Sequence, residues 1–186
     1  MDNSKHLSKS TLFLISIFII IFLLDKIVLK GILFEWGSLK KDAVLIKREY
    51  WRVITASFFH GGIIHLLANI IGLYWVGQLL EREIGSIGLN SIFVIGNIIA
   101  NILFIFTYSF ESSIGGSPGI YALIGVFLIL CFKEKKLLET HLHTRELNSL
   151  IVYFIAGNFN GLDTLFVHSV GFSTGIIISI LYNKIR

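Results

Sequence analysis

Long apolar runs, separated by short polar segments, dominate the pattern of this 186-residue chain. A helix that spans a bilayer needs about 20 mainly apolar residues, and six segments meet or approach that length. They cover residues 11–29, 62–80, 87–108, 118–132, 147–159 and 164–182, of which the fifth is the shortest and carries Asn158. The pattern predicts an all-α fold in which residues 1–186 form one polytopic membrane domain with six transmembrane helices.

The longest connection, residues 30–61, is too apolar to be a solvated linker. Its aromatic residues are Phe34, Trp36, Tyr50, Trp51, Phe58 and Phe59. Aromatic side chains of this kind favour the interface between lipid and water. We therefore expect this first loop to lie on or in the outer headgroup layer.

The N-terminal segment has two interpretations. Lys5 and Lys9 precede its apolar run, as basic residues do in a signal peptide, but no small-residue cleavage site follows, which favours a retained helix. The distribution of Lys and Arg gives a modest preference for a cytoplasmic N-terminus, although the basic residues of the first loop weaken it.

Composition agrees with a membrane protein. Hydrophobic residues make up 54% of the chain and charged residues 15%, and the mean hydropathy is +0.79. A soluble domain normally has about 25% charged residues, so lipid must solvate part of this surface. The net charge of +4 comes mostly from residues between apolar runs, which suits lipid headgroups better than nucleic acid. Cys131 is the only cysteine, so no intrachain disulfide is possible.

Strongly polar residues occur near one end of three predicted helices. His65 and Asn69 lie in the second, Ser117 precedes the fourth, and His168 lies in the sixth. In antiparallel spans, the second, fourth and sixth helices start at the same face, so these side chains should share one depth. A polar or ionisable side chain inside a bilayer is costly and by default indicates a functional site.

These residue types are those that acyl transfer requires. A serine hydroxyl such as that of Ser117 becomes nucleophilic when an adjacent base takes its proton, and the imidazole of His168 is the usual kind of base. The side chains of His65 and Asn69, and backbone N–H groups at the Gly116-Ser117 turn, could stabilise an oxyanion. No acidic residue is placed to orient His168, so the sequence predicts a Ser–His dyad that hydrolyses peptide bonds within the membrane.

On the sixth predicted helix, two glycines lie on the same helix face as His168. His168, Gly171 and Gly175 follow the spacing i, i+3, i+7 and share one helix face. Small residues let membrane helices approach closely. This face could therefore bring His168 against Ser117, with Tyr121 on the opposing surface.

Each signal also has an ordinary structural explanation. Ser117 followed by Pro118 is a common helix start, and His168 alone could be an interhelical hydrogen-bond donor. Asn97 and Asn101 are taken as structural, and Glu81 with Arg82 as a cytoplasmic anchor. No HExxH motif occurs, which argues against a zinc protease. The catalytic interpretation depends on the signals occurring together.

Taken in order, these motifs resemble the rhomboid family of intramembrane serine proteases, in its compact six-helix bacterial form. The resemblance extends from about Glu49 to Gly175. Its elements are Trp51-Arg52, the spaced His60, His65 and Asn69, then Glu81, Gly115-x-Ser117 with Tyr121, and His168-x-x-Gly171-x-x-x-Gly175.

The resemblance implies Ser117 as nucleophile, His168 as general base and Tyr121 packed on the His168 ring. It implies that His65, Asn69 and the backbone N–H of Ser117, in the turn with Gly116, stabilise the oxyanion. Substrates would be single-span membrane proteins, with the fifth helix and its loop admitting them. No metal, nucleotide or other cofactor is expected, no nucleic acid partner, and a bacterial inner membrane is implied.

One departure from the family pattern concerns the residue after the serine. The family usually has glycine there, whereas this chain has Pro118, which has no N–H and a fixed φ. An inactive relative that binds membrane-protein clients therefore stays as an alternative. A small transporter or channel is a third, but it predicts inverted repeats or polar residues throughout the membrane depth, and the chain has neither.

Overall fold

The computed structural model describes residues 8–185, and in that range every regular element is a helix. The elements, in order, are α1 (Lys9–Leu23), η1 (Leu24–Val28), α2 (Ile32–Gly37), α3 (Lys41–Leu45), α4 (Arg52–Thr55), η2 (Ala56–Phe58), α5 (Ile63–Thr107), α6 (Ser117–Lys133), α7 (Lys135–His141), α8 (Arg145–Ala156), η3 (Gly157–Phe159) and α9 (Leu162–Ile185). The expected all-α membrane bundle is confirmed.

A break at Gly85 divides the long helix α5. Gly85 has φ 71° and ψ 168°, outside the helical region and in the positive-φ range that favours glycine. The two halves, residues 63–84 and 86–107, correspond to the second and third predicted helices. Each half has about 22 residues, which is enough to cross a bilayer.

Within residues 8–185, three helical stretches are long and apolar enough to span a membrane, namely Lys9–Val28, Ile63–Thr107 and Leu162–Leu181. A fourth is possible if α6 and α7, which meet at a bend of 114°, form one broken span. Helix α8 differs from these because its 12 residues extend for only about 18 Å. It lies where the fifth predicted segment does, but is shorter than a typical spanning helix.

Glu81, which the sequence analysis took with Arg82 as a cytoplasmic anchor, contacts the beginning of α1. Its carboxylate is buried and accepts hydrogen bonds from the backbone N–H groups of Ser10 at 2.9 Å and Thr11 at 3.2 Å. The hydroxyls of Thr11 and Ser86 also donate to it. The first N–H groups of a helix lack intrahelical partners, so Glu81, in the last turn before the break at Gly85, caps α1 from a distant part of the chain.

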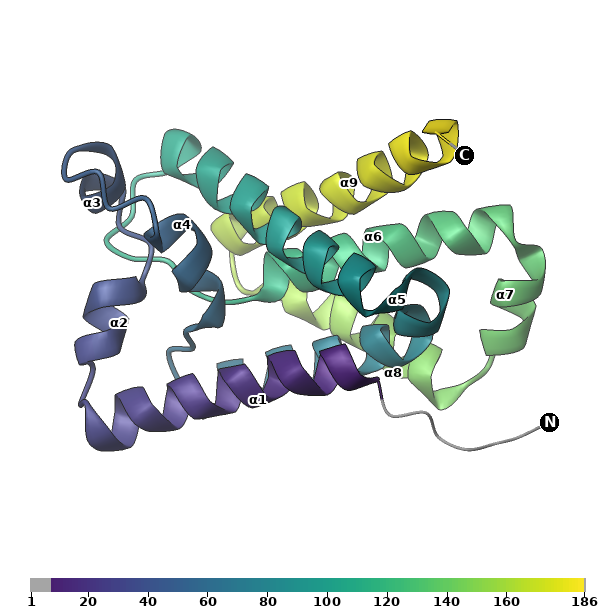
Figure 1. Cartoon of the computed structure of the whole chain (residues 1–186), viewed down its shortest axis with the longest axis horizontal. Coiled ribbons are helices and arrows are strands. Elements are labelled where there is room, and N and C mark those ends of the chain that lie inside the picture. The colour runs from purple at the N-terminus through teal and green to yellow at the C-terminus, as the bar shows by residue number, and fades with distance from the viewer. Residues whose placement is uncertain (1–7, 186) are drawn as a thin grey trace.

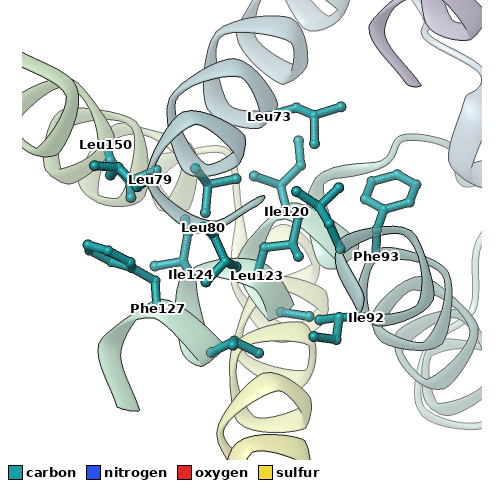
Figure 2. Packing of buried hydrophobic residues seen from close by; sticks show 14 of the residues in the cluster. Leu73, Leu79, Leu80, Ile92, Phe93, Ile120, Leu123, Ile124, Phe127 and Leu150 are labelled. Atoms are coloured by element: carbon teal, nitrogen blue, oxygen red, sulfur yellow. The ribbon is translucent and has the colours of Figure 1, made fainter. Parts of the chain in front are cut away.

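Helix α6 is the centre of the bundle. Its residues from Pro118 to Phe127 are all buried, and apolar side chains from both halves of α5 and from α8 surround it. Figure 2 shows this packing, with Leu73, Phe93 and Leu150 approaching α6 from different sides. The core therefore fixes the position of the helix that begins with Ser117.

The first loop folds onto one end of the bundle. Leu39, Val44 and Ala56 pack with Phe104 and Ile105 near the end of α5. In Figure 1, α6 and α9 both begin on the side of the molecule where α2, α3 and α4 lie, while α7 lies at the opposite side. The beginnings of α6 and α9 are thus at the same end of the molecule.

Candidate active site

Ser117 and His168 are joined by a hydrogen bond. Ser117 is the first residue of α6, and its Oγ lies 2.8 Å from Nε2 of His168 on α9. Tyr121, one turn further along α6, is buried and stacks on the imidazole with ring centroids 4.0 Å apart and planes inclined by 14°. The nucleophile and base types that the sequence singled out are therefore in direct contact.

Glycines on α9 allow this approach. A Cβ on Gly171 would lie 2.1 Å from the carbonyl oxygen of Pro118, and a Cβ on Gly175 would lie 1.9 Å from that of Ala122. Gly125 of α6 has the reciprocal role, since its Cβ would lie 2.3 Å from the carbonyl oxygen of Phe172. Backbone packs on backbone along this face, so the spacing of the α9 glycines has a direct structural use.

Asn158 is a contact of His168 that the sequence analysis did not assign. Its Oδ1 lies 3.1 Å from Nδ1 of His168. Asn158 lies in η3, and its Nδ2 donates to the carbonyl of Phe154 at 2.7 Å. The sequence has no acidic residue placed to orient His168, and the amide in the short fifth apolar segment is the sequence signal for this contact.

Candidate oxyanion donors gather on the other side of Ser117. Nε2 of His65 would lie 2.8 Å from a Cβ on Gly115, whose φ of +120° favours glycine. Asn69 is buried, and its Nδ2 donates one N–H to the carbonyl of His65, one turn earlier on the same helix, at 3.0 Å. The second N–H of the amide remains available to donate to an oxyanion. As the first residue of α6, Ser117 has an N–H that no intrahelical carbonyl accepts.

A cavity of about 560 Å³ opens beside these groups. His65, Asn69, Ser117 and His168 all contribute to its wall. Tyr153 and Gly157 from the α8–η3 segment, and Asp163 and Thr164 from the start of α9, also line it. A substrate segment entering this cavity could reach both the serine oxygen and the candidate donors.

The turn before Ser117 is tightly packed. A Cβ on Gly116 would lie 2.8 Å from Cζ of Phe18 and 3.0 Å from the carbonyl oxygen of Ser57, so a side chain does not fit. Asn97 Oδ1 accepts the N–H of Gly119 at 3.1 Å, and its Nδ2 donates to the carbonyl of Phe93. Asn97 thereby satisfies a first-turn N–H of α6 and helps to fix the turn.

Other residues of the sequence motifs have structural contacts away from Ser117. Arg52 binds Glu49 and donates to the carbonyls of Glu35 and Ser38, and Trp51 stacks on Trp36. These contacts hold the first loop together. None of these residues, nor Glu81, belongs to the cavity wall.

His60 is buried between aromatic rings. Its ring centroid lies 4.8 Å from that of Phe18 and 5.0 Å from that of His65. Burial, with a smaller effect of neighbouring His65, lowers the pKa of His60 to about 3, so the ring is neutral at physiological pH. Among residues 8–185, no three His, Cys, Asp or Glu side chains are grouped so that they could hold a metal ion.

Comparisons with known proteins identify the family. RHOMBOID-like protein 7 of Arabidopsis thaliana is 28% identical over 152 residues, covering 79% of this chain and 47% of the relative. RHOMBOID-like protein 4 of the same plant is 30% identical over 144 residues, covering 76% of this chain and 36% of the relative. Rhomboid-like protease 3 of Toxoplasma gondii is 25% identical over 141 residues, covering 73% of this chain and 53% of the relative.

The chain spans about half, or less, of the length of these relatives. The model of the Rhomboid domain matches residues 47–185, which includes α5 to α9 and the cavity between them. The long apolar helices agree with a multi-pass membrane protein, and the chain belongs to the rhomboid family.

Proposed function

We propose that this protein is an intramembrane serine endopeptidase that cuts peptide bonds in or near the transmembrane segments of membrane proteins. The observation that carries the proposal is the hydrogen bond of 2.8 Å between Ser117 Oγ and His168 Nε2 at the wall of the cavity. One relative, Rhomboid-like protease 3 of Toxoplasma gondii, supports it by name.

In the proposed reaction, Ser117 Oγ attacks the scissile carbonyl carbon while its proton passes to His168 Nε2. The side chains of His65 and Asn69 and the N–H of Ser117 stabilise the oxyanion, with Gly116 shaping the turn. Collapse of the intermediate breaks the C–N bond, and His168 returns the proton to the leaving nitrogen. A water then attacks the acyl carbon of the acyl-enzyme while one of its protons passes to His168. His168 returns this proton to Ser117 Oγ as the ester C–O bond breaks, which frees Ser117 and releases a carboxylic acid that ionises to the carboxylate.

Tyr121 would support this chemistry by holding the imidazole. Its ring lies parallel to that of His168, so the imidazole can tilt little without losing contact. A neutral dyad also avoids placing a permanent ion pair in lipid, where charges are expensive. The absence of a carboxylate partner for His168 among the described contacts is therefore compatible with the proposed base.

The proposed substrates are single-span membrane proteins, and the proposed location is a bacterial inner membrane with a cytoplasmic N-terminus. That orientation predicts that Lys136→Cys, in α7, reacts with an impermeant maleimide only after the cells are opened. Lys47→Cys, in the first loop, should react in intact cells. The reverse labelling pattern would contradict the proposed orientation.

A client-binding relative without protease activity is the second candidate, and Pro118 is the observation that favours it. Proline in the first turn of a helix is well tolerated, because its missing N–H would lack a partner there. The proposed backbone donor belongs to Ser117 itself. Pro118 therefore leaves the proposed machinery in place, which is why we favour the protease.

Cleavage of a single-span reporter protein, reconstituted in lipid with the enzyme, tests the proposal. The wild type should cut it, whereas Ser117→Ala and His168→Ala should both be inactive. Ser16→Ala, a change at an exposed α1 serine, is the matched control and should cut normally. Labelling by a fluorophosphonate should follow the same order. If the wild type neither cuts several reporters nor takes the label, the client-binding function replaces the protease.

A further inference from the structure

Three hydrogen bonds and one ring-stacking contact connect the end of α8 to the Ser117–His168 pair. The carbonyl of Phe154 accepts the hydroxyl of Tyr121 at 2.8 Å and Nδ2 of Asn158 at 2.7 Å. Asn158 Oδ1 then lies 3.1 Å from Nδ1 of His168. Tyr121 in turn stacks on the His168 ring, so these contacts form a closed network of Phe154, Tyr121, His168 and Asn158.

This network determines which atom of the Asn158 amide, Oδ1 or Nδ2, lies toward His168. An amide can present either its oxygen or its NH₂ group, and the surrounding hydrogen bonds decide between them. Rotating the Asn158 amide by half a turn would bring Oδ1 against the carbonyl oxygen of Phe154, and two acceptors repel. The Phe154 carbonyl therefore keeps Oδ1 directed at the imidazole.

The orientation of the amide in turn sets the tautomer of His168. An oxygen opposite Nδ1 requires that Nδ1 carries the proton, because only an N–H can donate to it. The lone pair of the neutral ring is then on Nε2, where the Ser117 hydroxyl is. The other tautomer would present an N–H to Ser117 and could not take its proton.

We propose that Asn158 is the positioning residue that holds His168 in its base-competent tautomer, so that His168 works only while the end of α8 is seated against it. The inference rests on the proposed function. Close packing supports it, because a Cβ on Gly157 would lie 2.7 Å from the Tyr121 hydroxyl and 3.6 Å from Cε1 of His168. An uncharged amide performs this role without placing a second ionisable group in lipid.

Two substitutions at Asn158 separate positioning from mere stability. Asn158→Leu keeps the size but removes the acceptor, so fluorophosphonate labelling of Ser117 should slow by about 10- to 100-fold, as expected for a lost hydrogen bond to a reacting group. With a reporter substrate, kcat should fall while KM changes little. Asn158→Asp loses the hydrogen bond from Nδ2 to the Phe154 carbonyl but keeps an acceptor for Nδ1–H, so it should recover only part of the labelling rate.

The pH profile supplies a readout that loss of stability would not change. A carboxylate opposite Nδ1 favours the imidazolium, which cannot act as a base. The acid limb of the labelling profile of Asn158→Asp should therefore lie at higher pH than that of the wild type. Asn148→Leu, the same change at an exposed position of α8, is the matched control and should match the wild type in rate and profile.

A direct measurement of the tautomer separates this inference from the proposed function. Imidazole ¹⁵N spectra of histidine-labelled protein, with His168→Ala to assign the signal among the six histidines, report which nitrogen is protonated. The wild type should have a proton on Nδ1, and Asn158→Leu should have a mixture. This test holds even if the wild type proves inactive, in which case only the protease proposal fails.

Three results would overturn the inference. The first is wild-type labelling speed in folded Asn158→Leu. The second is a pH profile of Ser117 labelling in Asn158→Asp whose acid limb lies at the same pH as in the wild type. This result alone would overturn the inference if Asn158→Leu does not fold. The third is an Nδ1 signal that is identical in the wild type and in Asn158→Leu.

Discussion

The ring of Tyr121 lies nearly parallel to the imidazole of His168, while its hydroxyl reaches 2.8 Å to the carbonyl of Phe154 on α8. One side chain of α6 thus contacts α8 and α9 at once. The ring limits how far the imidazole can tilt, and the hydroxyl limits how far α8 can move. These two contacts can be separated experimentally, because phenylalanine keeps the ring and removes only the hydroxyl.

Tyr121→Phe should therefore lower activity moderately and Tyr121→Ala severely. Loss of the hydroxyl removes one hydrogen bond, worth about 0.5–1.5 kcal/mol, whereas loss of the ring leaves a cavity that costs about 3–5 kcal/mol. Thermal unfolding in detergent and the labelling rate of Ser117 measure the two effects. Equal losses in both variants would show that the ring contact with His168 is unimportant.

Gly175→Ala should separate α9 from α6. The added Cβ would lie 1.9 Å from the carbonyl oxygen of Ala122, and a backbone atom cannot move aside as a flexible side chain can. We expect the 2.8 Å contact between Ser117 and His168 to be lost and labelling of Ser117 to fall by at least about 100-fold, as a misplaced catalytic group implies.

Gly61→Ala is the control for this change. Its Cβ would meet only Cδ1 of Ile114, at an ordinary 3.6 Å. This variant should label like the wild type. Normal labelling of Gly175→Ala, in contrast, would mean that the two helices tolerate a wider separation than the packing indicates.

Glu81→Ala should destabilise the protein without altering the chemistry. The substitution leaves the N–H groups of Ser10 and Thr11 without their acceptor, and a buried unsatisfied donor costs about 1–3 kcal/mol. The melting temperature should fall, while the labelling rate per folded molecule stays within about twofold. Glu83→Ala removes an exposed carboxylate two residues further along the same helix and should leave both quantities unchanged.

Pro118→Gly tests whether the departure from the family pattern matters. The 2.8 Å contact of Ser117 with His168 does not involve the nitrogen of residue 118. Labelling should therefore stay within about threefold of the wild type, and stability should fall slightly because glycine adds freedom to the unfolded chain. A large gain in activity in this variant would instead show that Pro118 suppresses catalysis in the natural protein.

The sequence alone predicted much of the fold, because helix-length apolar runs have few structural solutions in lipid. The positions of most helices and the all-α bundle followed from that constraint. A break between the two halves of α5 also followed, since the largely polar residues 81–86 separate the second and third predicted helices. Helix α7 did not, because its seven mostly polar residues are too short and too polar to be recognised as a spanning helix. The hydrogen bonds of Glu81 did not follow from the sequence either, because its partners on α1 are about 70 residues away.

For the candidate site, the sequence determined which residue types were available and on which helices. Periodicity put His168, Gly171 and Gly175 on one face, and antiparallel spans put Ser117 and His168 at one end. Only the tertiary structure decided that Asn158 reaches His168 and that the Phe154 carbonyl orients its amide. Hydrogen bonds depend on distances and angles within tenths of an ångström, and the packing of α8 against α6 and α9 sets those values.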